Sequence, residues 1–88
     1  MMVVYAIASI EHNYIYVGMT NNLENRLARH NGGRERTTRF YAPFKTIYVE
    51  ECNDRESARV REKYWRSGVG KEKLRELRNK KMLEWRNW

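Results

Sequence analysis

Two short apolar runs separated by a polar segment constrain the fold of this chain most strongly. Residues 3–9 and residues 14–19 are rich in β-branched and aromatic side chains, and the polar residues Glu11-His12-Asn13 lie between them. Such side chains fit the pleated surface of a sheet, and a short polar segment between two such runs is typical of a turn. The pattern therefore predicts an antiparallel β-hairpin.

The position of the turn also predicts the register of the hairpin. A turn centred on the polar segment pairs Tyr5 with Gly18 and, two residues further along, Ile7 with Tyr16. Tyr5 and Tyr16 then become diagonal neighbours on one face of the sheet, close enough for long aromatic side chains to share a site. A shift of the register by one residue would separate them.

A helix is predicted directly after the hairpin. Asn21 is a suitable N-cap because Glu24 follows three residues later, and Leu23 and Leu27 recur at helical spacing. The pair Gly32-Gly33 is expected to end the helix.

The remaining elements follow from the same kinds of signal. The sequence predicts a basic loop over 34–42, a third strand over 44–49, a second helix from Asn53 or Asp54 to about Trp65, a break over 67–70, and a third helix from about Lys71. The order strand, strand, helix, strand, helix, helix indicates an α/β fold of the α+β type. It has a small central three-stranded antiparallel sheet flanked by about three helices.

Length and charge narrow the choice of function. The chain of 88 residues is expected to form a single domain over 1–88, and 18 Lys and Arg against 11 Asp and Glu give a net charge of +7. Such a surface favours a polyanion as partner. No apolar run approaches the roughly 20 residues of a membrane-spanning helix, and no stretch resembles a signal peptide, so we expect no membrane association.

The single cysteine, Cys52, excludes an internal disulfide and a multi-cysteine zinc site. A reducing, cytoplasmic location fits this composition. Because Cys52 follows a strand-like run, we interpret it as a buried space-filling residue rather than a reactive thiol.

Three polar residues on the predicted helices are candidates for chemistry. Arg26 and His30 lie one turn apart at the edge of the leucine stripe, so both should face the sheet. Glu62 shares a helical stripe with Ala58 and Trp65 and therefore needs a partner, which is either an arginine such as Arg26 or a divalent cation. Each residue also has an ordinary structural interpretation, since helix arginines are often solvated and a histidine at a helix end can cap carbonyls.

Taken in order, these residues resemble the motifs of a known family. Val3-Val4-Tyr5 and Tyr16-Val17-Gly18 stand at its two tyrosine motifs, Arg26 at its helix arginine, and Glu62 at its metal-binding glutamate; Ser67-Gly-Val-Gly resembles its glycine-containing turn. The chain resembles the GIY-YIG nuclease superfamily. The likeness is greatest to small single-domain bacterial members, which are similar to the amino-terminal nuclease domain of the excision-repair incision protein. It covers roughly residues 3–77 and leaves a helical tail over 78–88 outside.

The resemblance implies a metal-dependent endonuclease that hydrolyses phosphodiester bonds in DNA during repair, recombination or the processing of DNA structures. Glu62 would hold one Mg²⁺ or Mn²⁺ ion, and Arg26 would stabilise the charge that develops on the phosphate. Tyr5 would activate the attacking water and Tyr16 would orient water or phosphate. Because the pKa of a free tyrosine is about 10, this role needs help from His30 and Arg26.

Two further features complete the expected site. Gly18, opposite Tyr5, would leave space where a side chain would obstruct the site. Phosphate contacts are expected from the basic residues Arg34, Arg36, Arg39, Lys63 and Lys71. The substrate would be DNA, with RNA also open.

Two alternatives belong to other functional classes. The chain could be a non-catalytic nucleic-acid-binding module with the same fold. It could also be an interaction domain whose last helix uses Trp85 and Trp88 to dock a protein partner or a second copy of itself. The plain structural interpretation of that helix is that it folds back over the sheet.

Overall fold

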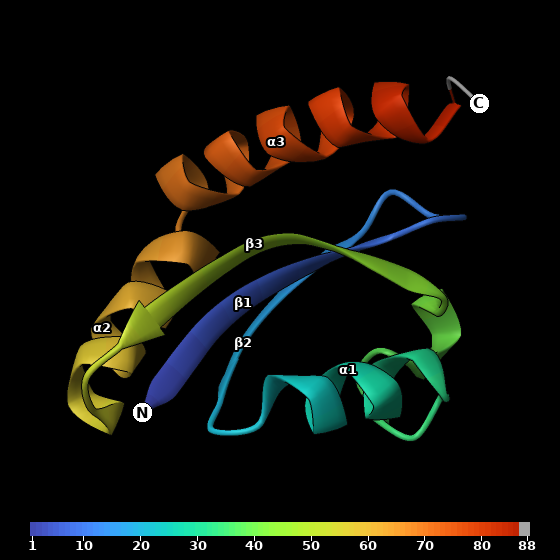
Figure 1. Ribbon diagram of the computed structural model, residues 1–88. Coiled ribbons are helices and arrows are strands. Elements are labelled where there is room, and N and C mark those ends of the chain that lie inside the picture. The colour runs from blue at the N-terminus through green and yellow to red at the C-terminus, as the bar shows by residue number, and fades with distance from the viewer. Residues whose placement is uncertain (87–88) are drawn as a thin grey trace.

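The computed structural model describes residues 1–86 and contains one antiparallel sheet with helices on both faces (Figure 1). The elements in chain order are β1 (Met2–Ser9), β2 (Ile15–Thr20), α1 (Leu23–Asn31), a short 3-10 helix (Arg39–Tyr41), β3 (Phe44–Cys52), α2 (Arg55–Arg66) and α3 (Gly68–Arg86). The strand order is β2-β1-β3, with β1 in the centre. The predicted fold class is confirmed.

The predicted register of the hairpin is also confirmed. Tyr5 pairs with Gly18, and Ile7 pairs with Tyr16. Because β1 is the central strand, it is hydrogen-bonded on both sides, and every residue from Val4 to Ser9 is buried.

The two faces of β1 contact two separate cores. Tyr5 and Ile7 pack with Phe44 and with the leucines of α1, whereas Val4, Ala6 and Ala8 belong to the core under α2 and α3. In Figure 1, α1 lies on one side of the sheet and α3 on the other. This alternation is what the period of two along a strand requires.

An irregularity in β3 was not predicted. Ala6 pairs with Tyr48 but the next residue, Ile7, pairs with Thr46, so Ile47 is an extra residue in β3. Ile47 and Tyr48 therefore contact the same core although they are consecutive. The strand also continues to Cys52, which is buried, and burial raises the pKa of its thiol.

Two predicted helix boundaries are wrong by a few residues. The N-cap of α1 is Asn22 rather than Asn21, because the side chain of Asn22 accepts a hydrogen bond from the backbone N–H of Asn25. The break before α3 is a single residue, Ser67. Its hydroxyl accepts from the N–H of Gly70, so α3 begins at Gly68 instead of Lys71.

The third helix continues through the segment expected to be a tail. Leu74 is buried, and Leu77 and Trp85 are partly buried against the same core. Trp88, the other aromatic residue expected in this stripe, lies outside the described residues. None of the helices in the described part of the chain is long and apolar enough to cross a membrane.

A carboxylate on β3 ties the sheet to α2. Glu50 accepts hydrogen bonds from Arg61, from the hydroxyl of Tyr48 and from the indole N–H of Trp65. The hydrogen bond from Arg61 is the main reason that the pKa of Glu50 falls to about 2, and burial opposes this shift only in part. The ionised form is therefore the one that stabilises the fold.

We expect this carboxylate to make the stability of the fold sensitive to acid. The folded-state pKa is below the ordinary value of 4.5, so the stabilisation is complete above that pH and disappears as the pH falls towards about 2. Urea unfolding at pH 7, 4 and 3 measures the free energy of unfolding. As the pH falls from 7 to 3, this free energy should decrease less for Glu50→Gln than for the wild type. Glu51→Gln, at the exposed neighbouring position, should behave like the wild type; equal acid sensitivity of all three proteins would contradict the role of Glu50.

Candidate active site

The two motif tyrosines lie side by side on the face of the sheet that α1 covers. Their ring centroids are 6.2 Å apart. Tyr5, on the central strand, has no exposed surface, whereas Tyr16, on the edge strand β2, is half-buried. The two rings therefore differ in their access to a ligand.

Gly18 makes room for both tyrosines. A Cβ atom at this position would lie 2.7 Å from the Tyr5 hydroxyl and 2.8 Å from Cε2 of Tyr16. Such distances are shorter than van der Waals contact, so any side chain here would displace the rings. Because glycine has no side chain, only backbone atoms of residue 18 lie next to the Tyr5 hydroxyl.

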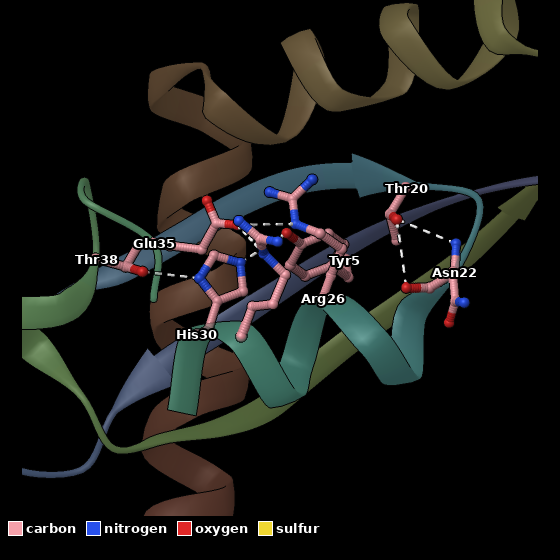
Figure 2. A network of polar contacts seen from close by, with 8 residues as sticks. Tyr5, Thr20, Asn22, Arg26, His30, Glu35 and Thr38 are labelled. Atoms are coloured by element: carbon pink, nitrogen blue, oxygen red, sulfur yellow. Dashed lines mark hydrogen bonds and ion pairs between the residues drawn. The ribbon is translucent and has the colours of Figure 1, made fainter. Parts of the chain in front are cut away.

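His30 links Tyr5 to the loop after α1 (Figure 2). Its Nε2 is 2.8 Å from the Tyr5 hydroxyl, and its Nδ1 is 2.7 Å from Oγ1 of the fully buried Thr38. Burial is the main reason that the pKa of His30 is lowered, and the positive charge of Arg26 lowers it further. The imidazole is therefore neutral near pH 7, with one nitrogen that donates and one that accepts.

Burial keeps the Tyr5 hydroxyl protonated. It raises the pKa of Tyr5 well above the usual value, and the positive charge of Arg26 counteracts it only partly. The negative charges of Glu35 and Glu62 raise the pKa further. Tyr5 consequently cannot act as a free phenolate, and its proton can leave only towards an acceptor such as His30.

Arg26 projects from α1 beside these groups (Figure 2). Its Nε lies 3.7 Å from a carboxylate oxygen of Glu35, which is an ion pair but not a hydrogen bond. Glu35 instead accepts a hydrogen bond from Nε of Arg29 at 2.8 Å, and this bond is the main cause that lowers the pKa of Glu35. Among the described residues, the buried Nε of Arg26 has no hydrogen-bond partner.

Glu62 approaches the site from α2. Its side chain is 18% exposed, and one oxygen lies 3.5 Å from Arg66 on the next turn of the helix. The suggested pairing of Glu62 with Arg26 is wrong, because Arg26 pairs with Glu35 and Glu62 with Arg66. The negative charge of Glu62 is the smallest of the charges that raise the pKa of Tyr5.

The donor set around Glu62 fits only one type of metal site. No group of three or more His, Cys, Asp or Glu residues that could hold a metal occurs within residues 1–86. Mg²⁺ commonly uses one or two carboxylates and completes its shell with water and phosphate oxygens, as does Mn²⁺ in similar sites. The partly buried carboxylate of Glu62 fits such an ion and does not fit a closed zinc site.

The residues expected to contact phosphate are spread over several elements. Arg34, Arg36 and Arg39 are exposed in the segment between α1 and β3, and Lys63 is exposed on α2. Lys71 is different, because its Nζ donates a hydrogen bond of 2.7 Å to the carbonyl oxygen of Ile15 on β2.

Three residues of the site were not predicted from the sequence. Thr38 gives no sequence signal, since its burial depends on how the loop packs against His30. Glu35 could have been noticed as the single acidic residue in a basic loop. Arg66 could have been noticed because it follows Glu62 by four residues, the spacing of helical ion pairs.

Comparison with known proteins identifies the family of the chain. The profile of the GIY-YIG catalytic domain matches residues 1–75. The chain is 35% identical over 71 residues to UPF0213 protein CPE1444 of Clostridium perfringens, which covers 80% of this chain and 76% of that protein. It is 32% identical over 78 residues to UPF0213 protein BLi00048/BL00536 of Bacillus licheniformis, covering 88% and 80%, respectively. No solved structure gives a significant match.

The contact distances at Gly18 lead to a prediction about stability. Gly18→Ala should displace Tyr5 and Tyr16 and destabilise the fold by about 1–3 kcal/mol, the usual range for overpacking. Urea unfolding would measure the loss. Gly68→Ala is the matched control, because a Cβ there meets nothing within 4 Å and should leave stability unchanged or slightly improved. Equal stabilities of the two variants would contradict the close packing at Gly18.

Proposed function

The chain belongs to the GIY-YIG catalytic domain family, and from this membership we propose that it is a metal-dependent endonuclease that hydrolyses phosphodiester bonds in DNA. The observation that carries the proposal is the hydrogen-bonded chain from Tyr5 through His30 to Thr38 beside an arginine whose buried Nε has no partner. A buried donor without a partner is uncommon in a purely structural cluster, because leaving it unpaired is costly.

In the proposed reaction, Tyr5 activates water by exchanging protons. Tyr5 has no exposed surface in the free protein, so this step requires the attacking water to reach its hydroxyl when substrate is bound. The Tyr5 oxygen then takes a proton from the water while the Tyr5 hydroxyl passes its own proton to Nε2 of His30, which is 2.8 Å away. The proton therefore ends on His30, and Tyr5 stays neutral before and after the step. This route avoids the phenolate that burial disfavours, and Thr38 holds the imidazole in the orientation that the transfer needs.

Arg26 is proposed to bind the scissile phosphate. The transition state of phosphodiester hydrolysis places additional negative charge on the phosphate oxygens, and a guanidinium stabilises it through charge-assisted hydrogen bonds. The side chain of Arg26 is 30% exposed, so its guanidinium is available for this contact, and Glu35 keeps the side chain near the tyrosines. Tyr16, which is half-buried at the sheet edge, would orient the phosphate or the water.

Glu62 is proposed to hold the divalent ion that nucleases of this family generally use. The ion, Mg²⁺ or Mn²⁺, would supply charge neutralisation at the leaving oxygen. Glu62 is suited to this because its carboxylate is mostly shielded from solvent and only loosely paired with Arg66. Arg66 would also keep the carboxylate oriented towards the site.

The net charge of +7 supports a nucleic-acid substrate with little sequence preference. Exposed arginines at 34, 36 and 39 and the lysines at 63 and 71 are proposed to contact phosphates, which positions a strand without reading bases. Repair, recombination or processing of DNA structures would suit such a site.

Removal of Glu62 or Arg26 tests the proposed chemistry. With Mg²⁺ or Mn²⁺ present, the purified protein should cleave supercoiled, single-stranded or branched DNA, and Glu62→Gln and Arg26→Gln should each lower the rate by about 10²–10³-fold. Glu76→Gln and Arg59→Gln remove the same charges from exposed positions and should retain the activity. Cleavage should be read by gel electrophoresis, with circular dichroism as a check of folding.

Two results would contradict the proposal. Cleavage that persists unchanged in both site variants would indicate a contaminating nuclease or a different site. DNA binding without cleavage by every protein, with either metal, would identify the chain as a binding module of the same fold.

The role of His30 predicts a dependence on pH. Neutral His30 accepts the proton, and burial and Arg26 lower its pKa below the ordinary 6.5. The contribution of His30 should therefore be constant from pH 8 to 6.5 and fall about tenfold per pH unit once the pH is below its pKa. Cleavage at substrate concentrations well below saturation, which reports the free protein, would show an acidic limb that is lost in the slower variant His30→Gln; an identical limb in both proteins would exclude His30 as the proton acceptor.

A further inference from the structure

A line of connected hollows leads away from the candidate active site along the free edge of β2. The first, of about 340 Å³, is lined by Tyr16 together with Tyr14, Arg66 and Lys71. The second, of about 240 Å³, shares Tyr14 and Lys71 with the first and adds Arg75. Because the two hollows share lining residues, they lie next to each other, and we call this stretch of surface the path.

Four cationic side chains line this path. Arg66 lies near the end of α2, and Lys71, Arg75 and Arg78 follow on α3. The three residues of α3 are spaced at i, i+4 and i+7, which places them on one side of the helix. This side adjoins β2 and the hairpin turn, because Lys71 bonds to Ile15 and Arg78 bonds to Asn13.

Neutral oxygens hold several of these cations in place. Arg66 donates to the carbonyl oxygen of Val17 at 3.1 Å and Lys71 to that of Ile15 at 2.7 Å. Arg78 donates to the side-chain oxygen of Asn13 at 2.6 Å. These contacts fix the positions of the cations but leave their charges uncompensated.

Carboxylates compensate only part of the positive charge. Arg66 lies 3.5 Å from Glu62, and Arg75 lies 3.1 Å from the largely exposed Glu72. Burial is the main reason that the pKa of Lys71 is lowered, and the positive charges of Arg75 and Arg66 add to it. The cations are thus close enough to repel one another, and an anion bound between them would relieve this repulsion.

We propose that this path binds successive phosphates of one nucleic-acid strand and carries the strand from the active site along the edge of β2 to the hairpin turn. The inference rests on the proposed function, since it assigns the route of that substrate. Lys71 and Arg78 are seven residues apart on a helix, roughly 10 Å along its axis, so the row of cations is long enough to contact more than one phosphate of the strand. The next hollow contains the carboxylate-bearing residue Glu11, so the basic path ends near Arg78.

The arrangement favours a strand over a single small anion. A site for one phosphate would gather its donors around one point, whereas these cations form a row that begins beside Tyr16. The aromatic ring of Tyr14, stacked on Tyr41 at a centroid distance of 3.8 Å, lies in the middle of this row. A row of cations with an aromatic ring beside it is an arrangement with which proteins hold single strands.

Charge removal on opposite sides of α3 tests the proposal. The variant Arg75→Gln/Arg78→Gln removes two charges from the path, and Lys73→Gln/Lys80→Gln removes two charges from the opposite side of the same helix. Fluorescence anisotropy with a labelled single strand of about 20 nucleotides, without divalent metal, measures binding independently of cleavage. We expect the first variant to bind about tenfold more weakly and to reduce the slope of log K against log salt by about 1.4, or 0.7 per phosphate.

The control variant should change the affinity and the slope much less. Arg75→Lys/Arg78→Lys keeps both charges and should restore most of the affinity. Equal weakening by the two glutamine variants, or no weakening by either, would overturn the proposed path. If the wild type cleaves DNA and Arg75→Gln/Arg78→Gln binds it normally, the proposed path is wrong but the proposed nuclease activity stands. If no protein cleaves DNA and only Arg75→Gln/Arg78→Gln binds it weakly, the proposed nuclease activity is wrong but the proposed path stands.

Discussion

The pairing of β1 with β2 is the constraint on which the whole site depends. Because Tyr5 pairs with Gly18, no side chain at position 18 crowds the Tyr5 hydroxyl. The same register places Tyr16 on the same face of the sheet as Tyr5. A shift by one residue would turn Tyr5 into the core under α2 and α3 and would bring Val4 or Ala6 to the site. The burial of β1 on both faces excludes such a shift, since it would also exchange the contents of two differently sized cores.

The polar groups reach this face of the sheet in two different ways. Arg26 and His30 come from α1, which packs directly on it, whereas Glu62 comes from α2, whose core contacts lie on the opposite face. In the proposed mechanism Glu62 would therefore act from around the sheet edge, where Arg66 bonds to the backbone of β2. A site at an edge can admit a long polymer, while a site under the centre of the sheet could not.

Local periodicity was sufficient to predict the sheet, its register and the residues that share the face with Tyr5. It could not predict the partners of charged groups, because the pairing of Arg26 with Glu35 instead of Glu62 depends on how a loop folds back over α1. The extra residue at Ile47 was hidden for a similar reason: a bulge changes which side chains face the core without changing the composition of the strand. The start of α3 depends on a hydrogen bond of Ser67, a residue that the glycines around it made look like part of a longer break.

The proposed chemistry also explains why Tyr5 and His30, between which the proton would move, are both held neutral. Burial raises the pKa of Tyr5 and lowers that of His30, so transfer between them is unfavourable in the free protein. A phosphate bound at Arg26 would bring negative charge next to His30, which favours the imidazolium and raises its pKa. The same phosphate would offset the positive charge of Arg26 that opposes protonation of the imidazole. Under this proposal His30 would become a stronger base when a substrate is bound, and the substrate itself would promote the activation of water.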